Sequence, residues 1–133
     1  MNLISVYNTQ AEPVLYELLR ERTPGQSISH KGMPAWDEHV RFVRSKPYHA
    51  WLLIEHDGIA VGSVYVTHQN EIGIFIFNDH RGHGYGKWAV QEVHRLFPGP
   101  HLANINPSND TSRGFFEGLG AKLVQVTYQL GST

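Results

Sequence analysis

A strand that runs directly into a glycine-rich loop and a helix constrains this chain more than any other feature. In the stretch EIGIFIFNDHRGHGYGKW (residues 71–88), three isoleucines alternate with other residues as in a β-strand, and three glycines then occupy every second position. Apolar residues at helical spacing follow, until Pro98-Gly99-Pro100 ends the pattern. A further strand at 101–105 would then be parallel to the first one and joined to it by the helix.

The other segments predict a mixed α/β sheet. Asp57-Gly58 between two β-rich runs indicates a hairpin, and Thr9 with Glu12 fits a capping box at the start of a helix. A long loop without periodicity covers 23–34. The expected strands are 3–7, 50–56, 59–67, 71–77, 101–105 and 121–130, and the expected helices are 11–21, 35–45, 85–97 and 110–119. With 133 residues and no linker or repeat, we expect one domain, residues 1–133.

Composition excludes several classes of function. The net charge of −1 and the pI of about 6.7 do not indicate a strong electrostatic attraction to nucleic acid or to an anionic membrane. The absence of cysteine excludes disulfides, a thiolate nucleophile and cysteine-based zinc sites. The first residues lack the pattern of a signal peptide, and no apolar run approaches the ~20 residues of a membrane span. We therefore expect a cytoplasmic protein.

The glycine loop is suited to bind an anion. A loop that enters a helix presents unpaired N–H groups and the positive end of the helix dipole, and Arg81 and Lys87 add positive charge. The nucleotide-binding patterns GxxxxGK[ST] and GxGxxG both fail here, whereas RxxGxG fits residues 81–86. A glycine-rich turn without a ligand is the alternative interpretation. His80 and His83 have the spacing of a metal-binding pair, but only Asp79 stands near as a third ligand, so we expect no metal.

The residues 71–93 resemble the GNAT superfamily of acetyl-CoA-dependent N-acetyltransferases, most of all the branch with ribosomal-protein N-terminal and amino-sugar acetyltransferases. That branch has an acidic residue at the start of the strand and an RGxGYG-type loop at this spacing. The segment NINPSNDTSRGFFEGLGAKL (104–123) is similar to the family's next motif, and the order of elements across the chain also matches. The resemblance implies a central, mostly antiparallel sheet with one parallel, splayed pair of strands and helices on both faces.

The same resemblance implies which residues bind acetyl-CoA. The loop amides would hold the pyrophosphate, the edge of the preceding strand would pair with the pantetheine arm, and Asn109 would hydrogen-bond to that arm. A plain N-cap is an equally good interpretation of Asn109. The implied cofactor-binding residues are Phe75, Ile76, Phe77, Arg81, Gly82, His83, Gly84, Tyr85, Gly86, Lys87, Asn109, Ser112 and Phe116.

The main candidates for catalysis are Glu71, Tyr128 and His30. Glu71 stands where family members often carry the base that removes the amine proton, although a solvated carboxylate at a sheet edge is the alternative. The family's usual general acid is a tyrosine, and Phe116 at that position cannot donate a proton. The thiolate then leaves unaided, or Tyr128, or with less support Tyr85, acts as the acid. His30 in the long loop could contact the acceptor or act as a base, with a surface histidine as the alternative.

The sequence indicates the identity of the acceptor less clearly than that of the coenzyme. Residues 28–51 loosely resemble acetyltransferases that act on nucleotide-linked amino sugars, with Trp36, Trp51, Arg41 and Arg44 as candidate contacts. We therefore expect a small-molecule amine as the acceptor. A protein α-amine, an acyl-CoA-binding domain without catalysis and an unrelated phosphate-binding domain are the alternatives. About thirteen residues follow the last expected helix, too few for the family's usual pair of strands, so a second subunit could complete the acceptor side as a homodimer.

Overall fold

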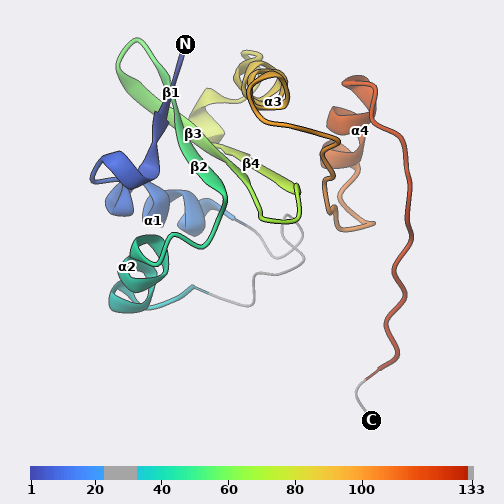
Figure 1. Ribbon diagram of the computed structural model, residues 1–133, viewed down its shortest axis with the longest axis horizontal. Coiled ribbons are helices and arrows are strands. Elements are labelled where there is room, and N and C mark those ends of the chain that lie inside the picture. Colours follow the sequence, from blue (N-terminus) through green and yellow to red (C-terminus); the bar gives the residue numbers. More distant parts are fainter. Residues whose placement is uncertain (23–32, 132–133) are drawn as a thin grey trace.

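The structure is a computed structural model, and it describes residues 1–22 and 33–131. Within them, four strands form one sheet in the order β1-β2-β3-β4, and each neighbouring pair is antiparallel (Figure 1). The strands are β1 (Asn2–Ser5), β2 (Ala50–His56), β3 (Ile59–Val66) and β4 (Ile72–Ile76). The helices are α1 (Glu12–Glu21), α2 (Trp36–Arg44), α3 (Tyr85–Leu96) and α4 (Asp110–Gly118), with 3-10 turns η1 (Val6–Asn8) and η3 (Asn78–His80). The predicted mixed α/β fold is confirmed.

The β2–β3 hairpin forms as predicted. Asp57 and Gly58 both adopt positive φ angles, 52° and 77°, which is the conformation of a two-residue turn that matches the twist of the strands. Three antiparallel strands in succession follow from this hairpin and from the turn that leads into β4.

Helices cover both faces of the sheet. On one face, buried residues of α3 pack against every second residue of the strands, among them Ile54, Val64 and Ile72. On the other face, α1 and α2 pack against the alternate residues, such as Trp51 and Leu53. The alternation along β4 therefore sends its isoleucines to the α3 face and its phenylalanine to the α1/α2 face.

Two contacts fix the position of α1 against its neighbours. The Nε2 of the buried His39 in α2 lies 2.8 Å from the Glu12 carbonyl oxygen, to which it donates a hydrogen bond. At the other end of α1, a carboxylate oxygen of Glu21 accepts a hydrogen bond of 2.7 Å from the Asn78 N–H, just after β4. The C-terminal end of α1 is thereby held against the end of β4.

The predicted capping box is wrong. Ala11 occupies the N-cap of α1 and no side chain caps the helix, while the N–H of Thr9 bonds to the Val6 carbonyl of the preceding turn. Pro13 in the first turn lacks an N–H that would need a cap, and its fixed φ suits a helix start.

The last two predicted strands are also not found as such. The strand expected at 101–105 contributes one parallel bridge, Glu71 with Leu102, made by hydrogen bonds of 2.7 and 2.8 Å. The segment 121–130 is not a strand, because no sheet edge in the described residues lies beside it, and its residues are exposed. Figure 1 shows it leading away from α4 as an extended tail. None of the helices in the described ranges has the length and apolarity needed to cross a membrane.

Candidate functional site

The glycine loop forms the turn into α3. Gly82 and Gly84 have φ angles of +83° and +82°, a conformation that side chains with a Cβ rarely adopt, and Gly84 is the N-cap of the helix. A Cβ at either position would meet no atom within 4 Å, so open space lies in front of the loop backbone. Gly86 serves packing instead, because a Cβ there would lie 3.4 Å from the ring of Phe115 in α4.

The loop presents a row of unpaired backbone donors. The first intrahelical hydrogen bond of α3 runs from the Trp88 N–H to the Gly84 carbonyl at 3.0 Å. In the described part of the chain, no acceptor pairs with the N–H groups of residues 82–87. Together with the positive end of the helix dipole, this row can bind a phosphate or a pyrophosphate.

The edge of β4 next to this loop is largely free. β3 pairs along one edge of β4, and on the other edge the described residues make only the bridge at Glu71 and one side-chain contact, from Arg81 Nε to the Ile76 carbonyl at 3.2 Å. Alternation along an antiparallel strand directs the backbone groups of Ile74 to the free edge, whereas the Phe77 N–H donates to Val61. An extended ligand would therefore pair with Ile74 and Ile76. Ile74 was missed in the sequence, although the two-residue period of the strand could have identified it.

Asn109 and the residues after it begin α4. The Asn109 side-chain oxygen accepts a hydrogen bond of 3.1 Å from the Ser112 N–H, which makes Asn109 the N-cap of the helix. Phe116 is half-buried against the α3 side of the core, with its ring 5.0 Å from that of Phe115. These rings hold α4 beside the start of α3.

Glu71 is fixed by two neighbours at the start of β4. Its Oε1 accepts a hydrogen bond of 3.3 Å from the Thr67 hydroxyl, and its Oε2 accepts another from the side-chain amide of Asn104. The alternation of β4 places Glu71 on the α1/α2 face, the same face as Gly73 and Phe75. A carboxylate held in this way can accept a proton or bind an ammonium group.

The structure does not bring Tyr128 to Glu71. Tyr128 lies on the tail with 91% of its surface exposed, not on a strand as expected. His30 lies outside the described residues. His83 stacks on Tyr85 with ring centroids 5.4 Å apart, and the described residues contain no group of three metal-ligating side chains.

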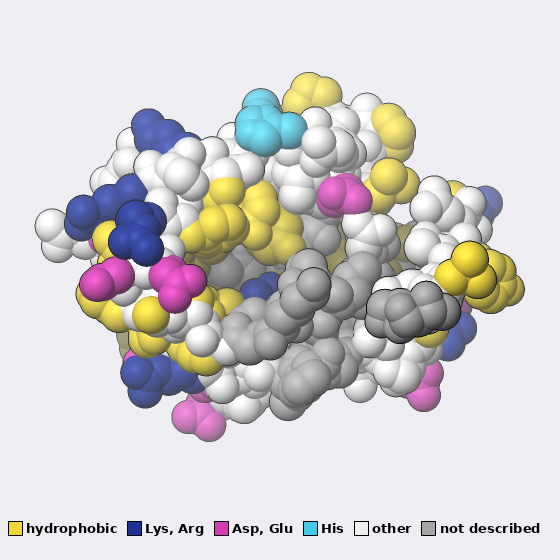
Figure 2. Space-filling model, turned by 90° about the horizontal axis from the view of Figure 1, so that it is seen from below, with side chains coloured by type: hydrophobic (Ala, Val, Ile, Leu, Met, Phe, Trp, Pro, Cys, Tyr) yellow, Lys and Arg dark blue, Asp and Glu magenta, His cyan; other side chains and the backbone are white. Residues whose placement is uncertain are grey.

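A pocket opens on the α1/α2 face of the sheet. It has a volume of about 60 Å³, and Figure 2 shows hydrophobic side chains bordering a hollow on the molecule seen from below. Its lining comes from α1 and the residue that caps its end, from α2, from the segment before β2, and from β2, β3 and β4. The lining residues are Leu15, Leu18, Leu19, Arg22, His39, Phe42, Tyr48, Trp51, Ser63, Tyr65 and Phe75.

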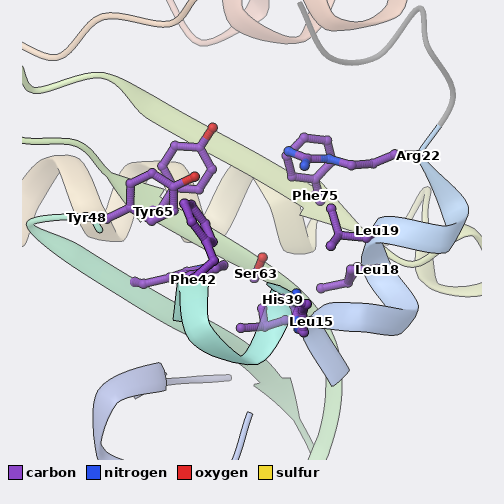
Figure 3. Close-up of a pocket in the computed structure, with 11 residues that line it drawn as sticks. Leu15, Leu18, Leu19, Arg22, His39, Phe42, Tyr48, Ser63, Tyr65 and Phe75 are labelled. Atoms are coloured by element: carbon purple, nitrogen blue, oxygen red, sulfur yellow. The ribbon is translucent and has the colours of Figure 1, made fainter. Parts of the chain in front are cut away.

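Arg22 supplies a positive charge to the described part of this pocket, and no sequence pattern had singled it out. Its guanidinium carbon lies 3.6 Å from the centroid of the Phe75 ring, and Figure 3 shows the side chain reaching inward from the end of α1. The Nε atom is buried and has no hydrogen-bond partner among the described residues. Burial lowers the pKa of Arg22 from its ordinary value, but an arginine side chain stays protonated in proteins.

Two tyrosines form the opposite side of the pocket. The rings of Tyr48 and Tyr65 stack at 4.0 Å with an angle of 4° between their planes. Burial, followed by the neighbouring Tyr65, raises the pKa of Tyr48, so its hydroxyl remains a donor at neutral pH. The Tyr65 ring lies directly over Gly73, where an added Cβ would be 2.1 Å from the ring.

Of the expected acceptor contacts, only Trp51 lines the pocket. Trp36 packs edge-on against Tyr16 at 5.2 Å, and Arg44 lies 3.7 Å from the Glu12 carboxylate on the outside of α2. The predicted role of these residues in binding an acceptor stays a prediction.

Comparison with known families decides the class of this protein. Residues 13–121 match the family described as Acetyltransferase (GNAT) family. The chain belongs to this family. The family predicted from the strand, the glycine loop and the α4 motif is therefore confirmed. A curated relative, the peptidyl-lysine N-acetyltransferase YjaB of Salmonella typhimurium, is 32% identical over 73 residues, which is 55% of this chain. The aligned region spans half the length of that relative.

Solved acetyltransferase structures share the fold. An acetyltransferase from Thermus thermophilus has a TM-score of 0.73 at 18% identity, over 93% of this chain and 88% of that one. The aminoglycoside N-acetyltransferase AAC(6')-Iy, solved in complex with CoA, gives 0.75 at 15% identity, over 98% and 93%. YncA, a putative acetyltransferase from Salmonella typhimurium solved with acetyl-CoA, gives 0.69 at 16% identity, over 99% and 88%. At these identities the likeness concerns the fold alone.

Proposed function

We propose that this chain is an acetyl-CoA-dependent N-acetyltransferase that acetylates the primary amine of a small molecule. The observation that carries the proposal is the row of unpaired N–H groups at residues 82–87, beside a free edge of β4, in a member of the GNAT family. The proposal treats residues 1–133 as one acetyltransferase domain in the cytoplasm.

The site fits coenzyme A in two respects. The open space in front of Gly82 and Gly84 allows a pyrophosphate to reach the backbone, with Lys87 and Arg81 close in sequence to balance its charge. The free backbone groups of Ile74 and the N–H of Ile76 suit an extended amide-containing arm, which would add to the sheet as a peptide strand does. When bound, acetyl-CoA supplies the acetyl group as a thioester.

Glu71 takes the role of base or amine anchor in this proposal. The hydrogen bonds from Thr67 and Asn104 hold its carboxylate in one orientation, so that it can remove a proton from the acceptor ammonium, directly or through a water. Phe116 cannot protonate the leaving thiolate, and Tyr128 is on the exposed tail. In this proposal the thiolate therefore leaves without being protonated by a side chain, which the ordinary thiol pKa of ~8.5 permits.

Calorimetric titration with acetyl-CoA, coenzyme A, ATP and NAD tests the coenzyme. We expect binding of the two coenzyme A species only, and its loss in Gly84→Glu, which places a carboxylate where the pyrophosphate would lie. Gly120→Glu is the matched control, since Gly120 also has a positive φ (+91°) and open space around a Cβ. If no coenzyme A species binds, or if both variants lose binding equally, the proposed function is wrong.

We propose that the tail, residues 121–130, pairs with a second copy of the chain and so forms a homodimer. Four apolar residues alternate with polar ones along it as in an amphipathic strand, and they are 61% to 95% exposed. These residues are Val124, Val126, Tyr128 and Leu130. An exposed strand of this kind is stabilised by pairing with another chain, and we propose a second copy as that partner. Sedimentation should give a dimer that Val126→Lys converts to a monomer. A monomeric mass for the unaltered protein at assay concentration would exclude this arrangement.

A further inference from the structure

We propose that the acceptor carries an anionic group, a carboxylate or a phosphate, and that Arg22 binds this group in the pocket under α1 and α2. The inference rests on the proposed acetyltransferase function and names the class of its acceptor. It depends on the position and partners of Arg22, which neither the family nor the coenzyme-binding loop assigns.

The charge of the lining is the first argument. Among the described residues that line the pocket, Arg22 is the only lysine or arginine, and none of them carries a carboxylate. The preceding Glu21 directs its carboxylate to the Asn78 N–H instead. The neighbouring segment 23–32, TPGQSISHKG, contains no acidic residue that could neutralise Arg22. A half-buried guanidinium without a carboxylate partner is an incomplete ion pair, which an anionic ligand would complete.

The orientation of Arg22 is the second argument. Its contact with the Phe75 ring holds the guanidinium plane in place, and the buried Nε still has a free N–H. A guanidinium fixed in this way can donate two parallel hydrogen bonds to a carboxylate or phosphate. Tyr48 and Tyr65 lie on the opposite side of the pocket, and their hydroxyl groups can donate hydrogen bonds to the same ligand (Figure 3).

The position of the pocket relative to Glu71 is the third argument. Glu71 lies on the same face of β4 as Phe75, the residue under Arg22. The two residues are four positions apart on the strand, which separates their Cα atoms by roughly 13 Å. Gly73 between them has no side chain, and the Tyr65 ring covers it. The pocket of about 60 Å³ accommodates the anionic end of an acceptor, while a chain of several atoms carries the amine toward Glu71.

The same features disfavour polycationic acceptors. An aminoglycoside or a lysine-rich peptide would place positive charge beside Arg22, and no described residue of the lining has a carboxylate to offset it. The names of two similar proteins, an aminoglycoside acetyltransferase and a peptidyl-lysine acetyltransferase, therefore do not indicate the acceptor of this chain.

A matched series of amines tests the inference. The acceptors are ω-amino carboxylates of three to eight carbons, the corresponding ω-amino amides, and ω-aminoalkyl phosphates, with kanamycin as a polycation. We expect kcat/KM for the carboxylates or phosphates to exceed that for the amides by roughly 10- to 100-fold, as for hydrogen bonds to charged groups, with an optimum at one chain length. The stronger of the carboxylate and phosphate series identifies the anion.

Two variants assign the preference to Arg22. Arg22→Met should remove the preference for anions and leave acetyl-CoA affinity unchanged. Arg20→Met is the control, because Arg20 is in the last turn of α1, two residues before Arg22, but is exposed and paired with Glu17. Equal rates for carboxylates, phosphates and amides, or a preference that survives in Arg22→Met, would overturn the inference.

A binding measurement separates this inference from the proposed function. Hexanoate and hexanamide lack the amine, and their binding is followed by the fluorescence of the protein, in which Trp51 lines the pocket. We expect hexanoate to bind more tightly than hexanamide, by an amount that Arg22→Met abolishes. Failure of this difference refutes the anion site even where acetyl-CoA binds, whereas failure of acetyl-CoA binding refutes the proposed function even where hexanoate binds.

Discussion

Replacing Gly73 with alanine tests the packing of the pocket wall. The new Cβ would lie 2.1 Å from the Cζ atom of Tyr65 and 2.4 Å from its hydroxyl oxygen. Ordinary contact distances are about 3.5 Å or more, so the ring must move by about 1.4 Å. Tyr48, stacked at 4.0 Å on the same ring, limits the directions in which the ring can move.

The expected cost is that of overpacking, about 1–3 kcal/mol. For a domain of this size, that cost lowers Tm by about 3–10 °C. Urea denaturation followed by tryptophan fluorescence measures the free energy of unfolding. Gly114→Ala is the control, because Gly114 lies in α4 with open space around a Cβ, and alanine there should stabilise the protein by about 0.5–1 kcal/mol.

A double-mutant cycle decides whether Tyr65 is the cause. Tyr65→Ala alone removes packing and destabilises the protein, but Gly73→Ala added to it should cost little, since the ring that it would strike is gone. The reasoning is refuted if the two single effects add, or if Gly73→Ala alone leaves the free energy of unfolding unchanged.

Three further predictions concern local structure. Asn109→Ala removes the side-chain oxygen that caps α4 and should lower the free energy of unfolding by about 1 kcal/mol in urea denaturation, with Asn109→Ser nearly unchanged. Asp57→Val should cost about 1–2 kcal/mol because of its φ of 52°, and an unchanged urea midpoint would contradict this. Burial, and then the charge of His94, lowers the pKa of His101, so His101 contributes stability that is lost as the pH falls below the ordinary imidazole range. His94→Gln should raise the pKa of His101 in an NMR titration without restoring its ordinary value; a pKa that does not move would refute the interaction.

Local sequence signals predicted the elements that build the coenzyme side. The Asp57-Gly58 turn, the alternation along β4 and the glycine loop before α3 each depend on neighbours within a few residues, and all three form as expected. The same holds for Asn109, whose capping bond reaches only three residues ahead. Local patterns of this kind survive folding because the tertiary structure adds packing without altering the turn chemistry.

The pocket on the α1/α2 face depends on contacts between residues that are distant in the sequence, and no local pattern predicted it. Arg22 looks like any charged residue at the end of an amphipathic helix, and its contact with Phe75 joins residues 53 positions apart, beside the bond between Glu21 and Asn78. The tail, residues 121–130, shows a second limit of prediction from the sequence. Its alternation predicts a strand, but an alternating pattern does not specify which sheet edge the strand will meet, and among the described residues it pairs with none of the strands.

The alternation of β4 connects the two sites. Its edge directs backbone groups of Ile74 and Ile76 toward the proposed coenzyme arm, while its α1/α2 face carries Glu71 and Phe75, the proposed amine anchor and the platform for Arg22. A shift of one residue in the β3–β4 register would exchange the two faces and send Glu71 and Phe75 into the α3 core. The register fixed by the Tyr65–Gly73 pair therefore determines both sites at once.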